Sequence, residues 1–127
     1  MEDLQQIRFP LEVINIAEKF KEEYGLTQNL PILKFAFAYA INKFKDQINF
    51  ETDDPLYKKN DGSNYGINSF ENDSNLRVAD LIKALFPQCE TPYRYMRIAI
   101  IYGILKLDKA KRYDPDFRII DVMQDVQ

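Results

Sequence analysis

The sequence predicts a mainly helical single domain, residues 1–127, with one short strand near its N-terminus and an oligomeric assembly. Its length of 127 residues is typical of one domain. Apolar side chains recur at helical spacing along most of the chain, whereas a period of two appears near the N-terminus. One helical segment is apolar on nearly all sides, and such a helix has to be buried on all sides. We therefore expect about four to five helices and a second copy of the chain that covers the apolar one.

The predicted strand is the segment of residues 5–9, in which polar and apolar side chains alternate. Ile7 and Phe9 would face the core, and their neighbours Gln6 and Arg8 would face outward. The following residue is a proline, which suits the first turn of a helix.

Two helices are predicted after the strand. The first has apolar residues at helical spacing from residue 11 to residue 24 and stops at Gly25. Thr27 would cap the second, over residues 27–45, which tolerates Pro31 early in its length. This second helix is the apolar one, and we expect it to form the core of a dimer or tetramer. The residues predicted at the centre of that core are Phe35, Phe37 and Tyr39.

Residues 46–75 form a long polar loop that is rich in Asp and Asn. A connection of this length is uncommon unless it is functional or partly structured. Ser74 would then cap a helix over about residues 75–86.

The last long helix is predicted over residues 92–112, because Thr91-Pro92 is a clear helix start. Residues 113–127 would form a C-terminal tail or short helix with one apolar stripe, which should pack on the oligomer or on a partner. The members of that stripe are Phe117, Ile120, Met123 and Val126.

The composition leaves few tools for catalysis. The chain has no histidine and one cysteine, so it lacks the commonest general base and the commonest zinc ligand. We expect no catalytic residues, no metal and no cofactor. The longest nearly apolar stretch has 12 residues, against roughly 20 for a membrane span. The first residues show no charged segment followed by an apolar one, so we expect no secretory signal. We therefore expect a cytoplasmic protein that acts by binding or assembly, away from membranes.

Positive charge is concentrated in the last long helix. The whole chain has a net charge of −3, but residues 92–112 hold six bases and a single acid. On a helix, Arg94, Arg97, Lys109 and Arg112 fall within an arc of roughly 120°, so that side could follow a nucleic-acid backbone. Bases near the C-terminal end also complement the helix dipole and keep a helix soluble, and the two interpretations have equal weight.

A second possible phosphate contact is the start of the second helix, at Thr27 and Asn29. Free backbone N–H groups at a helix start bind phosphate well. An ordinary capped helix begins with the same residues, and by themselves they favour that interpretation.

The order strand, proline, amphipathic helix, Gly-Leu-Thr and apolar helix resembles the ribbon-helix-helix family. The resemblance implies a dimer in which the strands of two chains pair into a ribbon that enters a DNA groove. Gln6 and Arg8 would then contact bases, since glutamine suits adenine and arginine suits guanine. A short N-terminal strand without a ligand fits the same residues.

A series of short motifs also runs from residue 11 to residue 108. They are Lys19 and Lys21, the run Tyr24-Gly25-Leu26-Thr27-Gln28-Asn29, Phe-Ala-Phe-Ala from Phe35, the loop at 60–68, Leu81-Ile82-Lys83-Ala84-Leu85, and residues 102–107. In this order they resemble the DndE-type subunits of bacterial DNA phosphorothioation (DNA sulfur modification) systems. The resemblance implies an oligomeric, non-catalytic subunit in bacterial defence that binds duplex DNA, nicked DNA in particular, beside modification-complex proteins.

The function expected from the sequence is therefore that of a DNA-associated accessory protein of the phosphorothioation type, with backbone contacts to duplex DNA. A first alternative is a ribbon-helix-helix transcriptional repressor or plasmid-partition adaptor that reads a short operator. A second alternative is a protein–protein adaptor without DNA binding, in which the acidic loop and the tail dock a partner.

Overall fold

The computed structural model describes residues 2–71 and 77–119. It is mainly helical, as predicted, with one pair of short strands. In chain order the elements are β1 (Gln6–Arg8), α1 (Leu11–Glu23), α2 (Leu30–Phe44), the 3-10 turns η1 (Lys45–Gln47) and η2 (Pro55–Lys58), β2 (Asn64–Gly66), α3 (Asn68–Glu71), α4 (Val78–Leu85) and α5 (Pro92–Tyr113).

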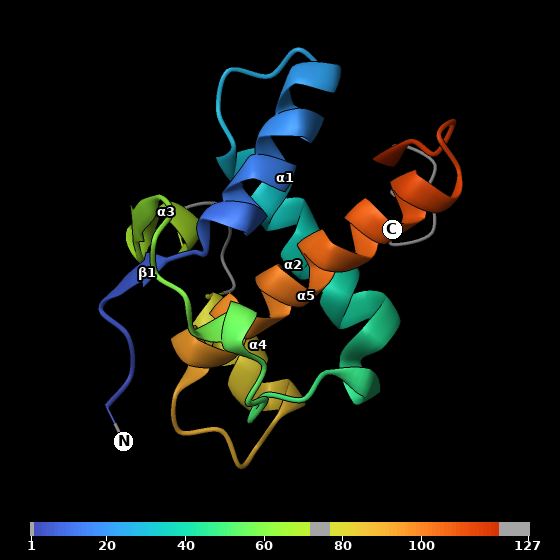
Figure 1. The fold of residues 1–127 in the computed structure, drawn as a ribbon. Helices are drawn as coiled ribbons and strands as arrows, with labels where there is room; N and C mark the ends of the chain where they lie inside the picture. The colour runs from blue at the N-terminus through green and yellow to red at the C-terminus, as the bar shows by residue number, and fades with distance from the viewer. Residues whose placement is uncertain (1, 72–76, 120–127) are drawn as a thin grey trace.

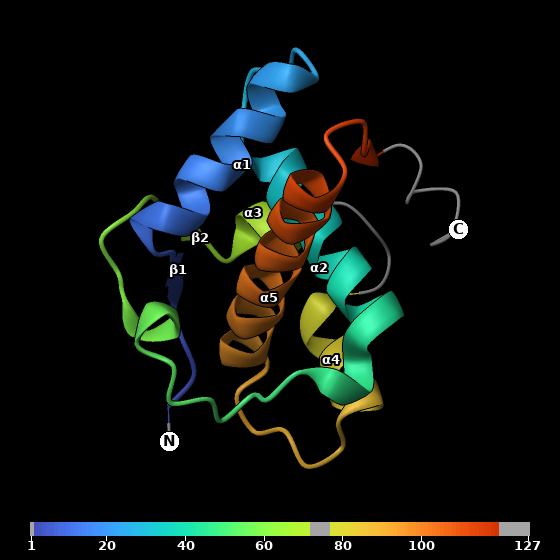
Figure 2. The same cartoon turned by 45° about the vertical axis from the view of Figure 1, so that its right-hand side comes forward.

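The long helix α5 is the centre of the fold. Figures 1 and 2 show α1, α2 and α4 arranged around it, with the β1–β2 pair beside α1. Its contacts with α2 are the most extensive, and it also packs on α4 and α1. Its inner face is apolar and fully buried, with Ile100, Ile101, Ile104 and Leu107 at 0% exposure. The sequence predicted this helix and its start at Pro92 correctly.

Helices α2 and α5 touch at Gly103. An ideal Cβ atom at this position would lie 2.2 Å from the carbonyl oxygen of Ala36 on α2. Only a glycine leaves room for so close a backbone approach, and Ala36 itself is fully buried at the crossing. The two small residues therefore set how closely the two largest helices pack.

Strand β1 pairs within its own chain, which corrects the expectation of a ribbon shared by two chains. It runs antiparallel to β2, with Ile7 opposite Tyr65. The partner strand comes from the polar loop of residues 46–75, which is thus partly structured. The carbonyl oxygen of Arg8 accepts a further hydrogen bond, at 2.8 Å, from Nε of Arg97 on α5. Since the strand is bonded to two elements of its own domain, it is not available as an open ribbon edge.

A turn in the same loop fixes the junction between β1 and α1. Asp61 Oδ1 accepts a hydrogen bond from the backbone N–H of Leu11 at 2.8 Å, and this bond lowers the pKa of the Asp61 carboxyl. The N–H of Gly62 donates to the carbonyl oxygen of Phe9 at 2.8 Å. A Cβ atom at Gly62 would lie 2.6 Å from that oxygen, so the turn requires glycine. Asp61 therefore caps α1, whose own N-cap residue, Pro10, has no side chain that can do so.

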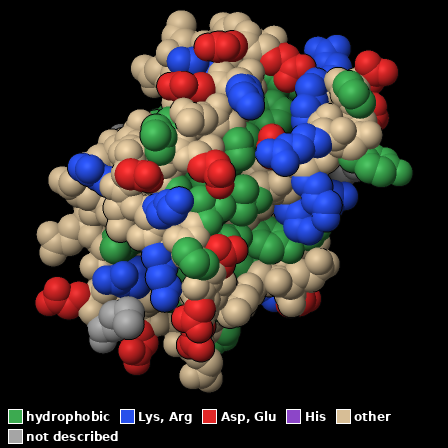
Figure 3. Space-filling view, viewed as in Figure 1, with side chains coloured by type: hydrophobic (Ala, Val, Ile, Leu, Met, Phe, Trp, Pro, Cys, Tyr) green, Lys and Arg blue, Asp and Glu red, His purple; other side chains and the backbone are tan. Residues whose placement is uncertain are grey.

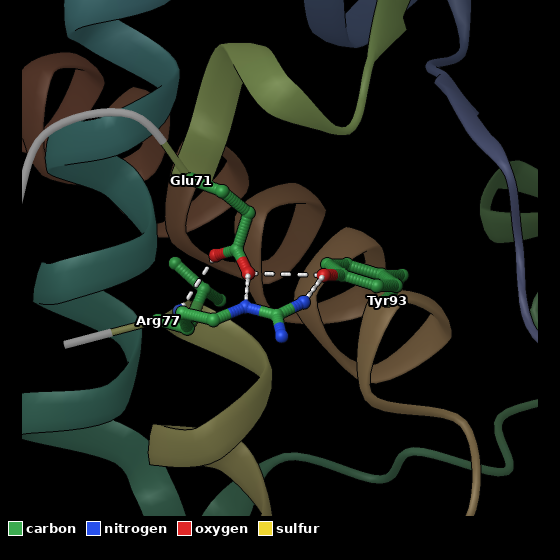
Figure 4. Close-up of polar contacts among 4 residues, drawn as sticks. Glu71, Arg77 and Tyr93 are labelled. Carbon is green, nitrogen blue, oxygen red and sulfur yellow. Dashed lines mark hydrogen bonds and ion pairs between the residues drawn. The ribbon is translucent and has the colours of Figure 1, made fainter.

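Carboxylates from outside the helix cap two further helices. Asp3 accepts hydrogen bonds from the backbone N–H groups of Tyr93 and Arg94, both at 3.0 Å, at the start of α5. Glu71 accepts from the N–H of Val78 at 2.6 Å at the start of α4. Figure 4 shows that the Glu71 carboxylate also meets Arg77 and the Tyr93 hydroxyl, so it joins α3, α4 and α5.

Helix α2 begins at Leu30 and not at the predicted residue 27. Asn29 is the N-cap residue, and Thr27 lies exposed in the preceding turn. Gly25 has a φ of +66°, so the stop predicted for α1 is confirmed. Helix α4 is shorter than predicted, and Ser74, its expected cap, lies outside the described residues.

The aromatic residues predicted for an oligomer core are half-buried within the chain itself. Phe35, Phe37 and Tyr39 pack against the main hydrophobic cluster. The rings of Phe35 and Tyr39 stack with their centroids 6.1 Å apart. Much of the apolar surface of α2 is thus covered by its own domain, chiefly by α5. The dimer or tetramer stays a prediction.

The first part of the C-terminal tail packs back on the domain. Ile119 is buried at 6% exposure, and its backbone N–H donates to the hydroxyl of Tyr24 at 2.6 Å. Lys111 Nζ donates to the carbonyl oxygen of Phe117 at 3.0 Å and pairs with Glu23 of α1 at 2.7 Å. The remaining members of the predicted stripe lie outside the described residues: Ile120, Met123 and Val126.

Candidate nucleic-acid interface

Arg97 is not available to phosphates, which corrects its place in the predicted interface. The residue is only 9% exposed, and its guanidinium donates to four oxygen atoms of its own chain. The acceptors are the carbonyl oxygens of Arg8, Tyr57 and Lys59 and the side-chain oxygen of Asn60. Burial and the neighbouring Arg94 lower the pKa of Arg97. The side chain thus fastens β1 and the 57–60 segment to α5.

Arg94 lies apart from the C-terminal bases of the same helix. It is half-buried, and its Nε donates to the carbonyl oxygen of Glu2 at 2.8 Å. It lines a groove of about 700 Å³ at the N-terminal end of α5. Lys109 lies fifteen residues further along, about 22 Å away at 1.5 Å per residue. The predicted line of bases is therefore not continuous: Arg94 lies at the groove, and Lys109 lies near the C-terminal end of α5.

The bases of the C-terminal half of α5 remain at the surface, and we call Lys106, Lys109 and Arg112 the α5 basic surface. Their spacing of three residues places them within roughly 120° of one another around the helix. Figure 3 shows Lys and Arg side chains gathered on the side of the molecule where α5 ends. Lys109 is exposed, and Arg112, whose side chain is 79% exposed, pairs with Asp108 at 2.7 Å.

Lys106 was not among the predicted contact residues, although its spacing of three from Lys109 was a usable signal. Its Nζ lies 5.2 Å from the ring centroid of Phe44 and 5.4 Å from that of Tyr102. Rings at this distance attract a cation, so they hold the ammonium group of this half-buried lysine over Phe44 and Tyr102. Among the residues that the structure describes, no acid forms an ion pair with either lysine.

The outward-facing residues of β1 lie away from the α5 basic surface. Gln6 and Arg8 are exposed, as predicted for the strand. Gln6 Oε1 accepts a hydrogen bond from Asn64 Nδ2 of β2 at 2.6 Å. Figure 1 places β1 and the C-terminal end of α5 on opposite sides of the domain. The structure therefore does not combine these strand residues and the helix bases into one continuous surface.

The start of α2 also lies outside the α5 basic surface. Thr27 precedes the helix by three residues and is not its cap. Asn29 is half-buried and makes no side-chain capping bond, and its Oδ1 atom is buried without a hydrogen-bond partner among the described residues. Neither side chain is brought next to a base of α5 by any contact within the described ranges.

Comparison with protein-family models, with curated proteins and with solved structures gives no match for this chain. Within the described ranges, no three His, Cys, Asp or Glu side chains are grouped so that they could hold a metal ion. None of the helices in these ranges combines the length and the apolar character that a membrane crossing requires.

Proposed function

We propose that this protein is a non-catalytic, DNA-associated accessory protein that holds duplex DNA by its phosphate backbone through the α5 basic surface. The observation that carries the proposal is the set of three bases on one side of α5, two of which form no ion pair among the described residues. Lysine and arginine at such a surface displace the counterions of DNA, which drives association.

Backbone contact is favoured over base readout by the placement of the strand. A ribbon-helix-helix repressor inserts into the major groove a ribbon made of one strand from each of two chains. Here β1 pairs instead with β2 of its own chain. Helix bases that reach phosphates carry no sequence information. We therefore expect binding without marked sequence preference, in line with the resemblance to DNA phosphorothioation subunits, which also suggests nicked duplexes and modification-complex proteins as partners.

The affinity should be low and strongly dependent on salt, since the chain as a whole carries a net charge of −3. With about three phosphates neutralised, the logarithm of the affinity falls with the logarithm of the salt concentration at a slope near −2.7. Between 50 and 200 mM salt this slope corresponds to a loss of about 40-fold.

The test is a salt titration of binding, by fluorescence anisotropy, to intact, nicked and random-sequence duplexes. The double variant Lys109→Gln/Arg112→Gln should flatten the slope by about two. The matched control is Lys19→Gln/Lys83→Gln, which removes the same charge from exposed positions of α1 and α4 and should keep the wild-type slope.

The outcomes separate the candidate functions. No measurable binding of the wild type near 50 mM salt would overturn the proposal in favour of a protein–protein adaptor. A strong preference for one sequence would favour the repressor. Tighter binding to nicked than to intact duplex would support the phosphorothioation resemblance, and equal binding would remove that part of the proposal.

A further inference from the structure

The groove of about 700 Å³ at the N-terminal end of α5 is distinct from the α5 basic surface. It lies between the start of α5, the segment of residues 50–60 and the connection of residues 88–91. A volume in the range of about 300–1,000 Å³ is that of small-molecule sites in proteins. Both cationic and aromatic side chains line the groove, so a ligand that fits it should carry a negative charge and a planar ring.

The floor of the groove carries a buried positive charge. Arg97 is 9% exposed, and all its hydrogen bonds are to neutral oxygen atoms. Within the described part of the chain no carboxylate pairs with it, and its charged neighbour is a second arginine, Arg94. A buried charge without a counter-charge is costly, so an anion in the groove would stabilise the folded protein.

Two further cations are positioned to hold that anion directly. The bond from Arg94 Nε to the carbonyl oxygen of Glu2 fixes the stem of the side chain, and the terminal nitrogens of Arg94 make no hydrogen bond to another described residue. Lys58 lines the same groove, and its contact with Asp53 is long, at 3.6 Å, and exposed. Such a pair contributes little, so the ammonium group is free to turn to a ligand. Arginine and lysine together are well suited to a phosphate group.

An aromatic wall stands beside these cations. The rings of Phe50 and Tyr95 stack with centroids 4.2 Å apart and planes inclined by 6°, and Phe86 packs edge-on against both. Both stacked residues line the groove. Planar rings held in this way suit a nucleobase, because base–aromatic stacking is tolerant of base identity. Glu51 and Glu90, exposed on the groove lining, could accept hydrogen bonds from the amino groups of a base.

We propose that this groove binds a nucleotide, with its phosphate on Arg94 and Lys58 above Arg97 and its base against the Phe50–Tyr95 wall. The nucleotide is either free or part of a single-stranded nucleic acid, and the phosphate and base chemistry is the same for both. The inference does not rest on the proposed contact between duplex DNA and the α5 basic surface, since the two sites use different residues.

The experiment is a calorimetric titration of the full chain, at constant ionic strength, with adenosine monophosphate, adenosine, inorganic phosphate and a short single-stranded oligo-dA. We expect adenosine monophosphate to bind saturably and at least tenfold more tightly than phosphate or adenosine alone. Arg94→Gln should weaken it at least tenfold. Tyr95→Leu should remove the advantage of adenosine monophosphate over phosphate. Oligo-dA binding more tightly than adenosine monophosphate identifies single-stranded nucleic acid as the source, and the reverse identifies a free nucleotide.

The controls keep the two proposals separate. Lys109→Gln should leave nucleotide affinity unchanged, and Arg94→Gln should leave the salt slope of duplex binding unchanged. Should Arg94→Gln fail to fold, as judged by circular dichroism, Lys58→Gln replaces it with an expected loss of several-fold. Absence of saturable binding, equal affinity for nucleotide and phosphate, or wild-type affinity in the folded groove variants would each overturn the proposal.

Discussion

Replacing Gly103 by alanine should force α2 and α5 apart where they cross. The added Cβ atom would lie 2.2 Å from the carbonyl oxygen of Ala36 and 2.8 Å from its carbonyl carbon, whereas ordinary contacts begin at 3.4 Å. The obstructing atoms belong to a helix backbone and cannot turn aside as a flexible side chain could. The helices therefore have to separate by about 1 Å or bend, with loss of contact between the largest packed surfaces of the fold.

The expected cost follows from two opposing effects. Overpacking of a close-packed core costs about 1–3 kcal/mol and occasionally more. Alanine is favoured over glycine inside a helix by about 1 kcal/mol, which offsets part of this cost. Because the clash is with a rigid helix backbone, the overpacking cost should lie in the upper part of that range, at about 2–3 kcal/mol. We therefore expect a net loss of about 1–2 kcal/mol in the free energy of unfolding, or a Tm lower by about 4–8 °C for a chain of this length.

The assay is urea unfolding followed by circular dichroism, together with a thermal scan. Gly66→Ala is the matched control, because no atom lies within 4 Å of the position that its Cβ atom would take and its φ is not positive. That variant should stay within about 0.5 kcal/mol of the wild type. If Gly103→Ala were as stable as Gly66→Ala, the close approach of α2 and α5 would be refuted.

Four further predictions test other parts of the structure. Arg97→Lys should lower the free energy of unfolding by about 2–3 kcal/mol in urea, because an ammonium group lacks the fork that reaches several carbonyls, and it should leave the salt slope of duplex binding unchanged. The N–H of Leu11 lowers the folded-state pKa of Asp61, so the contribution of this carboxylate to the free energy of unfolding is present above the ordinary pKa of about 3.9 and is lost as the pH falls through the lower folded value. Asp61→Asn should therefore reduce the loss of stability at acid pH, measured as the free energy of unfolding against pH. Removal of residues 114–127 should destabilise the protein by about 1–3 kcal/mol, since Ile119 is buried, and an unchanged Tm would contradict the packing of the tail. Analytical sedimentation at micromolar concentration should show a dimer or tetramer, and a monodisperse monomer would contradict the predicted oligomer.

The elements that the sequence predicted well are those with local signals. Pro10 and Gly25 bound α1, and Thr91-Pro92 starts α5, so these helices are recognisable from a few adjacent residues. The partner of β1 could not be found in this way. Strand β2 contains Asn64 and Gly66, has no apolar alternation, and is set in place by contacts with a strand almost sixty residues earlier in the chain.

The prediction that Arg97 is part of the interface was wrong for a related reason. Helical spacing places Arg97 on the same arc as Lys109, but spacing alone does not reveal which part of the arc a loop will cover. The 57–60 segment folds over the N-terminal half of α5 and supplies three of the four oxygens that accept hydrogen bonds from Arg97. The basic helix could therefore be predicted from the sequence. Which of its bases is buried, which lines the groove and which are exposed depends on tertiary packing.

The remote carboxylate caps have a consequence for how the chain folds. Asp3 caps α5 across about ninety residues, and Asp61 caps α1 across fifty, so neither bond can form until large loops have closed. During synthesis Asp3 is made first and the helix that it caps almost last. Contacts of this kind are expected to be absent from the folding transition state. Asp3→Ala should thus accelerate unfolding and leave the refolding rate nearly unchanged. These caps would then slow the unfolding of the native domain without taking part in the nucleation of its folding.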